Sequence, residues 1–503
     1  MLIYIVHECL KMKNKIFKIL LIILFIDGLF LACSFLPEIA IFDGEKEIKI
    51  NLPKYKTLID FSNKPDNKSA DSLIGKYLQD DSTKIAKLYI RKSLSEMRLR
   101  VVNNYLKNIE NNGIYALDNF FKSLIKEKRD SVVRISHYGD SQLEGDRITY
   151  FLRSSFQQKF GGNGIGFVGF NDIADNMNLF RNSSLNWNRY TVFHNRYGCR
   201  FYGLSGNVYK FSNYIIKKEN EDTIIKNDSS ATKYIFQKAT VNIALSQYVK
   251  YNKISLMYGR SSSKCLLNIY NQANNKKVLS DTLNPVEGFA LHNLNISSDL
   301  RSFKIEFSGD VSPDFYGLLI DGKNGVQVDN FSIRGHSGDG LLLINPEYLA
   351  TQLKKMNVRL VIFQYGCNAV PYVNTDEKCA QLEQMYYSLF KRFKDIAPDL
   401  SILVIGVGDM ATMYNGSYNS YPFIPKIRDA QKNAALKAGC AFWDLFSVMG
   451  GENSIITWTN KRLASYDGHF SYKGQKLIGN ELFKALMIEY NQYKLRQRKK
   501  ENL

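Results

Sequence analysis

The sequence predicts an α/β protein with a parallel sheet covered by helices on both faces, interrupted by an all-β insertion. Residues 326–490 alternate short, continuously apolar strands with amphipathic helices, which is typical of parallel sheets. The same rhythm begins in residues 131–170. Between these stretches, residues 171–313 contain short β-type segments separated by clusters of Asn, Gly and Ser. Because α/β elements lie on both sides of the β-rich stretch, we expect that stretch to be an insertion into one domain.

The individual helices and strands are predicted from the spacing of apolar residues and from the Gly, Pro and polar residues that separate the segments. Continuous apolar or β-branched runs predict strands of the parallel sheet at 131–138, 326–333, 358–364, 400–407 and 441–444. Apolar residues near a period of 3.6 predict helices at 84–109, 117–128, 147–160, 346–355, 376–396, 426–438 and 472–488. The helix at 147–160 is expected to stop at a Gly-rich cluster. Short alternating segments at 240–245, 253–258, 265–270 and 303–307 favour a β-sandwich or jelly roll.

The N-terminus has the pattern of a targeting segment. A lysine-rich stretch leads into an apolar run at 19–35, and residues 30–33 resemble a bacterial lipoprotein box that ends in Cys33. If this segment is processed, Cys33 becomes the lipidated first residue. The alternative is an uncleaved anchor, because a run of about 17–20 residues is long enough for a short span. Either interpretation places the mature chain in a bacterial cell envelope, periplasmic or surface-exposed, and attached to a membrane.

We therefore divide the chain into five parts. These are a signal peptide, lipoprotein signal or anchor (1–33), a mixed, partly helical region (34–125), a discontinuous α/β domain (126–170 and 326–490), the β insertion (171–325) and a basic tail (491–503).

Charge and cysteine content exclude several classes of function. The chain has 67 Lys+Arg against 48 Asp+Glu, a formal net charge of +19. The lysines are dispersed and no zinc-finger, helix-turn-helix or RNP pattern occurs, so we expect no nucleic-acid partner. None of the seven cysteines forms a CxxC or Cys/His cluster, and we expect no metal and no cofactor. A disulfide between Cys199 and Cys265 is left open.

Chemically useful side chains follow the predicted parallel strands. The first strand ends in Gly-Asp-Ser-Gln at 139–142, the next ends in a Gly-rich segment at 334–340, and the third precedes Asn368. Asp467 and His469 stand just before the last helix. Because the carboxyl ends of parallel strands meet at one edge of the sheet, we expect these groups to converge. A serine needs a base to become nucleophilic, and an aspartate can hold the imidazole in the required tautomer.

These motifs, in this order, resemble those of the SGNH, or GDSL, hydrolase superfamily over residues 131–170 and 326–490. The run 139–169 is similar to the peptidoglycan O-acetylesterase branch, whose members carry a β-sandwich after the first motif. The resemblance implies a flavodoxin-like, three-layer α/β/α domain. It also implies Ser141 as nucleophile, His469 as general base and Asp467 as its orienting partner.

The resemblance further implies an oxyanion hole. Its donors are the backbone N–H of Ser141, the backbone N–H of Gly338 and the side-chain amide of Asn368, with Gly335 as the alternative glycine. Pre-positioned donors of this kind are each worth about 3–4 kcal/mol in the transition state.

The expected function is a serine esterase that removes O-acetyl groups from an envelope or extracellular glycan, with peptidoglycan as one candidate, through an acyl-serine intermediate. The insertion is expected to bind the polysaccharide. Two alternatives remain open from the sequence: an O-acetyltransferase that uses the same triad, and a catalytically inactive glycan-binding lipoprotein.

Overall fold

The computed structural model describes residues 39–43, 46–50, 69, 109–113, 115–126, 131–212, 214–216, 233–235 and 238–501. The expected signal segment with Cys33, and the helix expected at 84–109 except for its last residue, lie outside these ranges. Within the described ranges, no helix combines the length and apolarity that a membrane span requires.

The chain divides into two compact units, residues 1–66 with 412–419 and residues 67–411 with 420–503. In the first unit, β1 (Ile39–Asp43) and β2 (Lys46–Ile50) form an antiparallel pair. Strands β20 (Ala411–Tyr414) and β21 (Ser417–Ser420) form a separate two-stranded sheet around residues 412–419. All remaining elements belong to the second unit.

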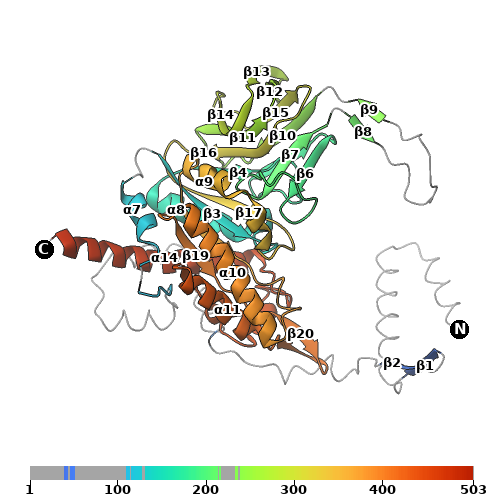
Figure 1. The fold of residues 1–503 in the computed structure, drawn as a ribbon, viewed down its shortest axis with the longest axis vertical. Helices are drawn as coiled ribbons and strands as arrows, with labels where there is room; N and C mark the ends of the chain where they lie inside the picture. The colour runs from blue at the N-terminus through green and yellow to red at the C-terminus, as the bar shows by residue number, and fades with distance from the viewer. Residues whose placement is uncertain are drawn as a thin grey trace, which may run out of the picture. The chain divides into compact units, whose positions relative to one another are not determined.

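A five-stranded, all-parallel sheet forms the centre of the α/β domain (Figure 1). Its strands, in spatial order, are β17 (Gly325–Ser332), β3 (Val132–Gly139), β18 (Val358–Gln364), β19 (Ser401–Ile405) and β22 (Ala441–Trp443). In sequence order this arrangement reads 2-1-3-4-5, the flavodoxin-like order. The predicted fold class is therefore confirmed. The strand order reverses between β3 and β18, and ligands of such sheets bind at that point.

Helices cover both faces of this sheet. One layer contains α7 (Asp118–Lys126), α8 (Arg147–Phe160) and α14 (Tyr472–Glu501), and the other contains α9 (Pro346–Lys355), α10 (Asp376–Ile396) and α11 (Ile424–Lys437). Consecutive residues of β3 contact different layers, as the pleat of a strand requires. His137 hydrogen-bonds to Thr149 of α8, whereas the ring of Tyr138 packs edge-on against Phe393 of α10. Shorter helices are η1 (Glu144–Asp146), η2 (Asp339–Leu343), α12 (Leu445–Met449) and α13 (Ser454–Asn460).

The β-rich stretch forms two antiparallel sheets around a second apolar core. One sheet has the order β13-β12-β15-β10-β5, and the other has β14-β11-β16-β7-β6 with β4 also paired to β16. The bounds are β4 (Gly164–Val168), β5 (Leu179–Ser183), β6 (Trp187–Thr191), β7 (Asn207–Phe211), β10 (Ala239–Leu245), β11 (Lys253–Ser261), β12 (Cys265–Asn271), β13 (Lys276–Leu283), β14 (Val286–Leu294), β15 (Ser302–Ser308) and β16 (Asp314–Asp321). Strands β8 (Tyr214–Ile216) and β9 (Lys233–Ile235) pair separately.

Two elements differ from the sequence expectations. Strand β4 begins at the end of the Gly-rich cluster that follows the expected helix, where no strand is predicted, and it pairs with β16 although it precedes residue 171. Helix α14 runs on from the expected end at 488 to Glu501. The extension is stabilised because Tyr490 and Tyr493 are buried and both rings contact Phe121 of α7.

A buried ion-pair network joins the insertion to the parallel sheet. Arg134 of β3 contacts Asp329 of β17 at 2.8 Å and Asp321, the last residue of β16, at 2.5 Å. Asp329 also accepts a hydrogen bond from the backbone N–H of Phe167 in β4. Burial acts to lower the pKa of Arg134, but the two carboxylates outweigh it and raise that pKa further. The guanidinium of Arg134 is therefore charged, and the two carboxylates balance that charge inside the protein.

We expect Arg134→Met to lower the free energy of unfolding by about 3–5 kcal/mol, because it leaves two buried carboxylates without their cation. Urea denaturation measures the effect. Lys391→Met removes an exposed ion pair with Asp395 and should leave the midpoint nearly unchanged. Equal midpoints for the wild type and Arg134→Met would show that the network does not hold the two parts together.

Candidate active site

The turn after β3 positions Ser141 at the edge of the parallel sheet. Gly139 ends the strand, and a Cβ there would lie 2.7 Å from the Leu143 side chain and 2.8 Å from the carbonyl oxygen of Gln364, so only glycine fits. The backbone N–H of Leu143 then closes the turn on the carbonyl of Asp140. Arg147, the first residue of α8, donates from Nη1 to the carbonyl oxygen of Ser141 at 2.9 Å. The position of Ser141 is thus fixed by the glycine-containing strand end before it and by Arg147 after it.

The structure brings the three predicted triad residues together. Ser141 Oγ lies 2.8 Å from His469 Nε2, although 328 residues separate the two positions. His469 Nδ1 lies 2.9 Å from Asp467 Oδ2. In the neutral imidazole, this pattern requires the tautomer with its proton on Nδ1, so that Nε2 accepts from the serine hydroxyl. The geometry is the one that general-base activation of a serine needs.

The loop that carries Asp467 and His469 is fixed by its own hydrogen bonds. Asp467 Oδ1 accepts from the hydroxyl of Ser465 and from the backbone N–H of His469. The N–H of Gly468 bonds to the carbonyl of Ser465 at 2.9 Å. Partial burial acts to raise the pKa of Asp467, but these donors and the imidazole hold that pKa below its ordinary value. The aspartate therefore stays ionised at neutral pH, as an orienting group must.

Asn368 is oriented by a buried carboxylate. Its Nδ2 donates to Asp140 Oδ2 at 2.9 Å and to the carbonyl oxygen of His336 at 3.2 Å. Asp140 Oδ1 accepts the backbone N–H of Gln142. Burial raises the pKa of Asp140 to about 6, although the N–H of Gln142 and the charge of His469 oppose the shift. Asp140 therefore links the turn of Ser141 to the amide of Asn368.

The two candidate oxyanion glycines lie in different surroundings. Gly335 is the third residue of a turn closed by the N–H of His336 on the carbonyl of Ile333, and its φ of 75° is accessible to glycine at little cost. That turn directly follows β17, and the N–H of Ile333 bonds to the carbonyl of Gly139 beside the nucleophile turn. Gly338 is buried, and a Cβ there would meet side chains of the core, Tyr365 and Leu389. Gly335 is thus the partly exposed one of the two.

The sequence did not single out Gln142 as a site residue. Its Nε2 donates at 2.8 Å to the carbonyl oxygen of Gly468, which lies between Asp467 and His469. The residue after Ser141 therefore bonds directly to the loop that carries His469. No residue pattern predicts a contact between positions 326 apart in the chain, and only its place beside Ser141 could have drawn attention to it.

One cysteine contacts this arrangement, because Cys367 Sγ accepts from Gln142 Nε2 at 3.8 Å. Cys199, Cys265, Cys367, Cys379 and Cys440 are free thiols, so Cys199 and Cys265 do not form the disulfide that was left open. In the ranges that the structure describes, no group of three or more His, Cys, Asp or Glu side chains is placed to hold a metal ion.

The fold matches solved structures, whereas the sequence matches no family model and no curated protein. A peptidoglycan O-acetylesterase superposes with a TM-score of 0.58 at 20% identity, covering 76% of this chain and 99% of its own. Smaller matches include an acetyl xylan esterase (TM-score 0.25, 14% identity, 32% of this chain and 80% of its own). A family two carbohydrate esterase from Clostridium thermocellum also matches (TM-score 0.24, 10% identity, 51% and 93%). The last two scores are too low to support an argument.

The superposition on the first of these structures, together with the parallel sheet and its antiparallel insertion, places the chain in the fold of the SGNH/GDSL hydrolases. At 20% identity this result defines the fold alone.

We expect Gln142→Leu to lower kcat for p-nitrophenyl acetate about tenfold and to change KM less than twofold, because one hydrogen bond that aligns the base with the nucleophile is lost. Gln352→Leu is the matched control, since Gln352 is also buried and also donates from Nε2 to a backbone carbonyl, that of Tyr202. Both variants should lose similar stability. If kcat falls equally in both, or in neither, Gln142 does not position the loop.

Asp140 gives a pH-dependent prediction. Its folded pKa of about 6 lies above the unfolded value of about 4, so its contribution to stability is present below about pH 4 and is lost as the pH rises through about 6. Asp140→Asn removes this titration. The free energy of unfolding of the wild type minus that of the variant should fall by about 2–3 kcal/mol between pH 4 and 7, measured by urea denaturation. A difference that is constant or increases with pH would contradict the assignment.

Proposed function

We propose that the protein is a serine esterase that removes O-acetyl groups from a glycan of the bacterial envelope or its surroundings. The observation that carries the proposal is the hydrogen-bonded series from Ser141 Oγ through the imidazole of His469 to Asp467, at 2.8 and 2.9 Å. The similarity of the fold to a peptidoglycan O-acetylesterase supports acetylated glycans, including peptidoglycan, as the substrate class.

In the proposed reaction, Ser141 Oγ attacks the carbonyl carbon of the acetyl ester while its proton moves to His469 Nε2. The tetrahedral intermediate then collapses, and the same proton passes to the sugar oxygen as the C–O bond breaks. Water, deprotonated by His469, attacks the acyl-serine; acetate leaves and the serine hydroxyl is restored. Asp467 stabilises the imidazolium in both halves without taking its proton.

The negative charge of the intermediate needs donors that are already in place. We assign the backbone N–H groups of Ser141 and Gly335, because Gly335 lies in the partly exposed turn beside Gly139 while Gly338 packs into the core. Asn368 supplies the third donor. Its bond to Asp140 holds the amide in place, and the oxyanion replaces the longer bond to the carbonyl of His336.

The exposure of the triad favours hydrolysis over acyl transfer to a second sugar. The side chains of His469 and Asp467 are 38% and 63% exposed, so water reaches the position from which it attacks the acyl-enzyme. A transferase must keep water away from the same position. The intact triad geometry also argues against a protein that only binds glycans.

The proposed location follows from the sequence alone. The apolar run and lipoprotein-like box that end in Cys33 support a membrane-attached protein of the cell envelope, with the β insertion as the part that binds the polysaccharide.

We expect Ser141→Ala to lower kcat/KM for p-nitrophenyl acetate by about 10⁴-fold or more, because no other hydroxyl hydrogen-bonds to His469 Nε2 among the described residues. The melting temperature should stay nearly unchanged. Ser154→Ala, an exposed serine on α8, is the matched control and should retain full activity. Substantial turnover by Ser141→Ala would refute the nucleophile assignment.

A further inference from the structure

A polar cavity of about 60 Å³ lies where the insertion meets the α/β domain. From the α/β domain it is lined by Glu144, Asn330 and Arg334, and from the insertion by Asp172, Arg189 and Asn207. Its volume suits a few water molecules or a small charged substituent, because one water needs about 10–15 Å³ on this measure. A whole sugar ring does not fit.

Two residues that line the cavity belong to segments that also carry the candidate active site. Glu144 begins the short helix η1 directly after the nucleophile turn, and Arg334 immediately precedes Gly335. The two side chains form an ion pair with Nη2–Oε2 at 2.6 Å and Nε–Oε1 at 3.0 Å. We therefore expect a group held in the cavity to belong to a part of the substrate close to the reacting ester.

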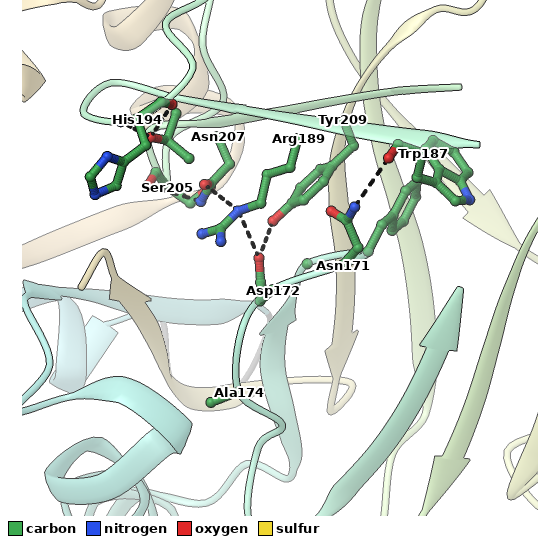
Figure 2. A network of polar contacts seen from close by, with 12 residues as sticks. Asn171, Asp172, Ala174, Trp187, Arg189, His194, Ser205, Asn207 and Tyr209 are labelled. Atoms are coloured by element: carbon green, nitrogen blue, oxygen red, sulfur yellow. Dashed lines mark hydrogen bonds and ion pairs between the residues drawn. The ribbon is translucent and has the colours of Figure 1, made fainter. Parts of the chain in front are cut away.

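Arg189 presents an unusual arrangement of donors to this cavity. Its Nε donates to Asn207 Oδ1 at 3.1 Å and lies 3.5 Å from Asp172 Oδ1. Figure 2 shows the two Nη atoms of Arg189 beyond Nε, on the side away from Tyr209 and Trp187. The side chain is only 15% exposed, so its orientation is set by these contacts. The guanidinium is thus held at one edge while its outer edge stays available.

The carboxylates at the cavity already have partners. Asp172 accepts the hydroxyl of Tyr209 at 2.5 Å and contacts Arg181 in addition to Arg189. Glu144 accepts three hydrogen bonds from Arg334. The third lining carboxylate, Asp146, is paired with Arg153 at 2.6 Å, so the charges around the cavity are close to balanced and the Nη edge of Arg189 is the donor group that a ligand carboxylate would meet.

A second hollow of about 390 Å³ continues from the cavity over the insertion. The two share Asp172, Ile173 and Arg181 in their linings. This larger volume has room for further sugar units outside the small cavity, so only a substituent of the glycan needs to enter the cavity.

We propose that this cavity binds a carboxylate carried by the acetylated glycan, with the outer edge of Arg189 forming the bidentate contact that guanidinium groups make with carboxylates. The carboxylate belongs to the unit next to the acetylated sugar. The inference rests on the proposed esterase function, because it names a feature of the substrate of that same site. Two sources share this chemistry: an acidic sugar ring and a carboxylate on a peptide substituent.

Calorimetry tests the proposal without requiring turnover. The probes are an oligouronate and a peptide-bearing peptidoglycan fragment, each compared with its own form in which the carboxyl groups are reduced or amidated. We expect the wild type to bind at least one acidic probe about tenfold more tightly than its blocked form. Whichever probe shows the difference identifies the source of the carboxylate.

The variants assign the effect to the cavity. Arg189→Gln should reduce the tenfold preference to about onefold, and Arg189→Lys should restore only part of it, since an ammonium lacks the planar fork. Arg334→Gln, at a more exposed position of the same cavity, tests the site if Arg189→Gln does not fold. Arg498→Gln removes the same charge from an exposed position on α14 and should bind as the wild type does.

A wild type that binds acidic and blocked probes equally well would overturn the proposal, as would an Arg189→Gln protein that keeps the preference. Failure of the esterase function is a separate result, because it is read from p-nitrophenyl acetate turnover and its dependence on Ser141. An active, Ser141-dependent esterase without any carboxylate preference would refute only the binding site.

Discussion

The candidate site depends on one geometric constraint: His469 must place Nε2 within hydrogen-bond distance of a serine 328 positions away in the chain. Neither loop achieves this alone. Ser141 is fixed by a strand that ends in glycine and by the guanidinium of Arg147, whereas His469 is fixed by bonds among residues 465–469. The parallel sheet and α14 set the distance between the two loops, and Gln142 joins them directly. The other contacts in the site, such as that of Asn368 with Asp140, add to the geometry that the contact between Ser141 and His469 defines.

The insertion contributes to the site through its attachment as well as through its surface. The buried contacts of Arg134 with Asp321 and Asp329 fix the end of β16 against β3 and β17. At their carboxyl ends, the same two strands lead into the candidate site. Strand β3 ends at Gly139, and the turn that contains Gly335 follows β17. One apolar core contains residues of both parts, such as Val192 and Tyr316 of the insertion with Phe331 of β17, and the cavity lined by Arg189 lies at the same junction.

Much of the fold could be predicted from residue pattern, because parallel strands buried on both faces are continuously apolar and their helices are amphipathic. Helices α8, α9 and α10 and strand β18 have the expected bounds. The sequence did not predict strand β4 because glycine is unfavourable in strands, and the strand is stabilised by pairing with β16 rather than by local preference. The sequence did not predict the end of α14 because its basic residues resemble a solvated tail, whereas the two tyrosines that precede them, Tyr490 and Tyr493, are buried.

The convergence of Ser141, Asp467 and His469 could be predicted because short motifs at strand ends are a local signal, and topology brings such ends together. Gln142, Asp140 and Arg189 act through contacts with residues distant in the chain, which no spacing reveals. The proposal of Gly335 in place of Gly338 likewise rests on the surroundings of each backbone, which the sequence does not reveal. The most direct test of the central claim is to quench the protein during turnover of an isotopically labelled acetyl ester and map the label by peptide mass spectrometry. The account predicts an acetyl group on Ser141; turnover with label on another residue, or with no covalent label under conditions where deacylation is rate-limiting, would contradict it.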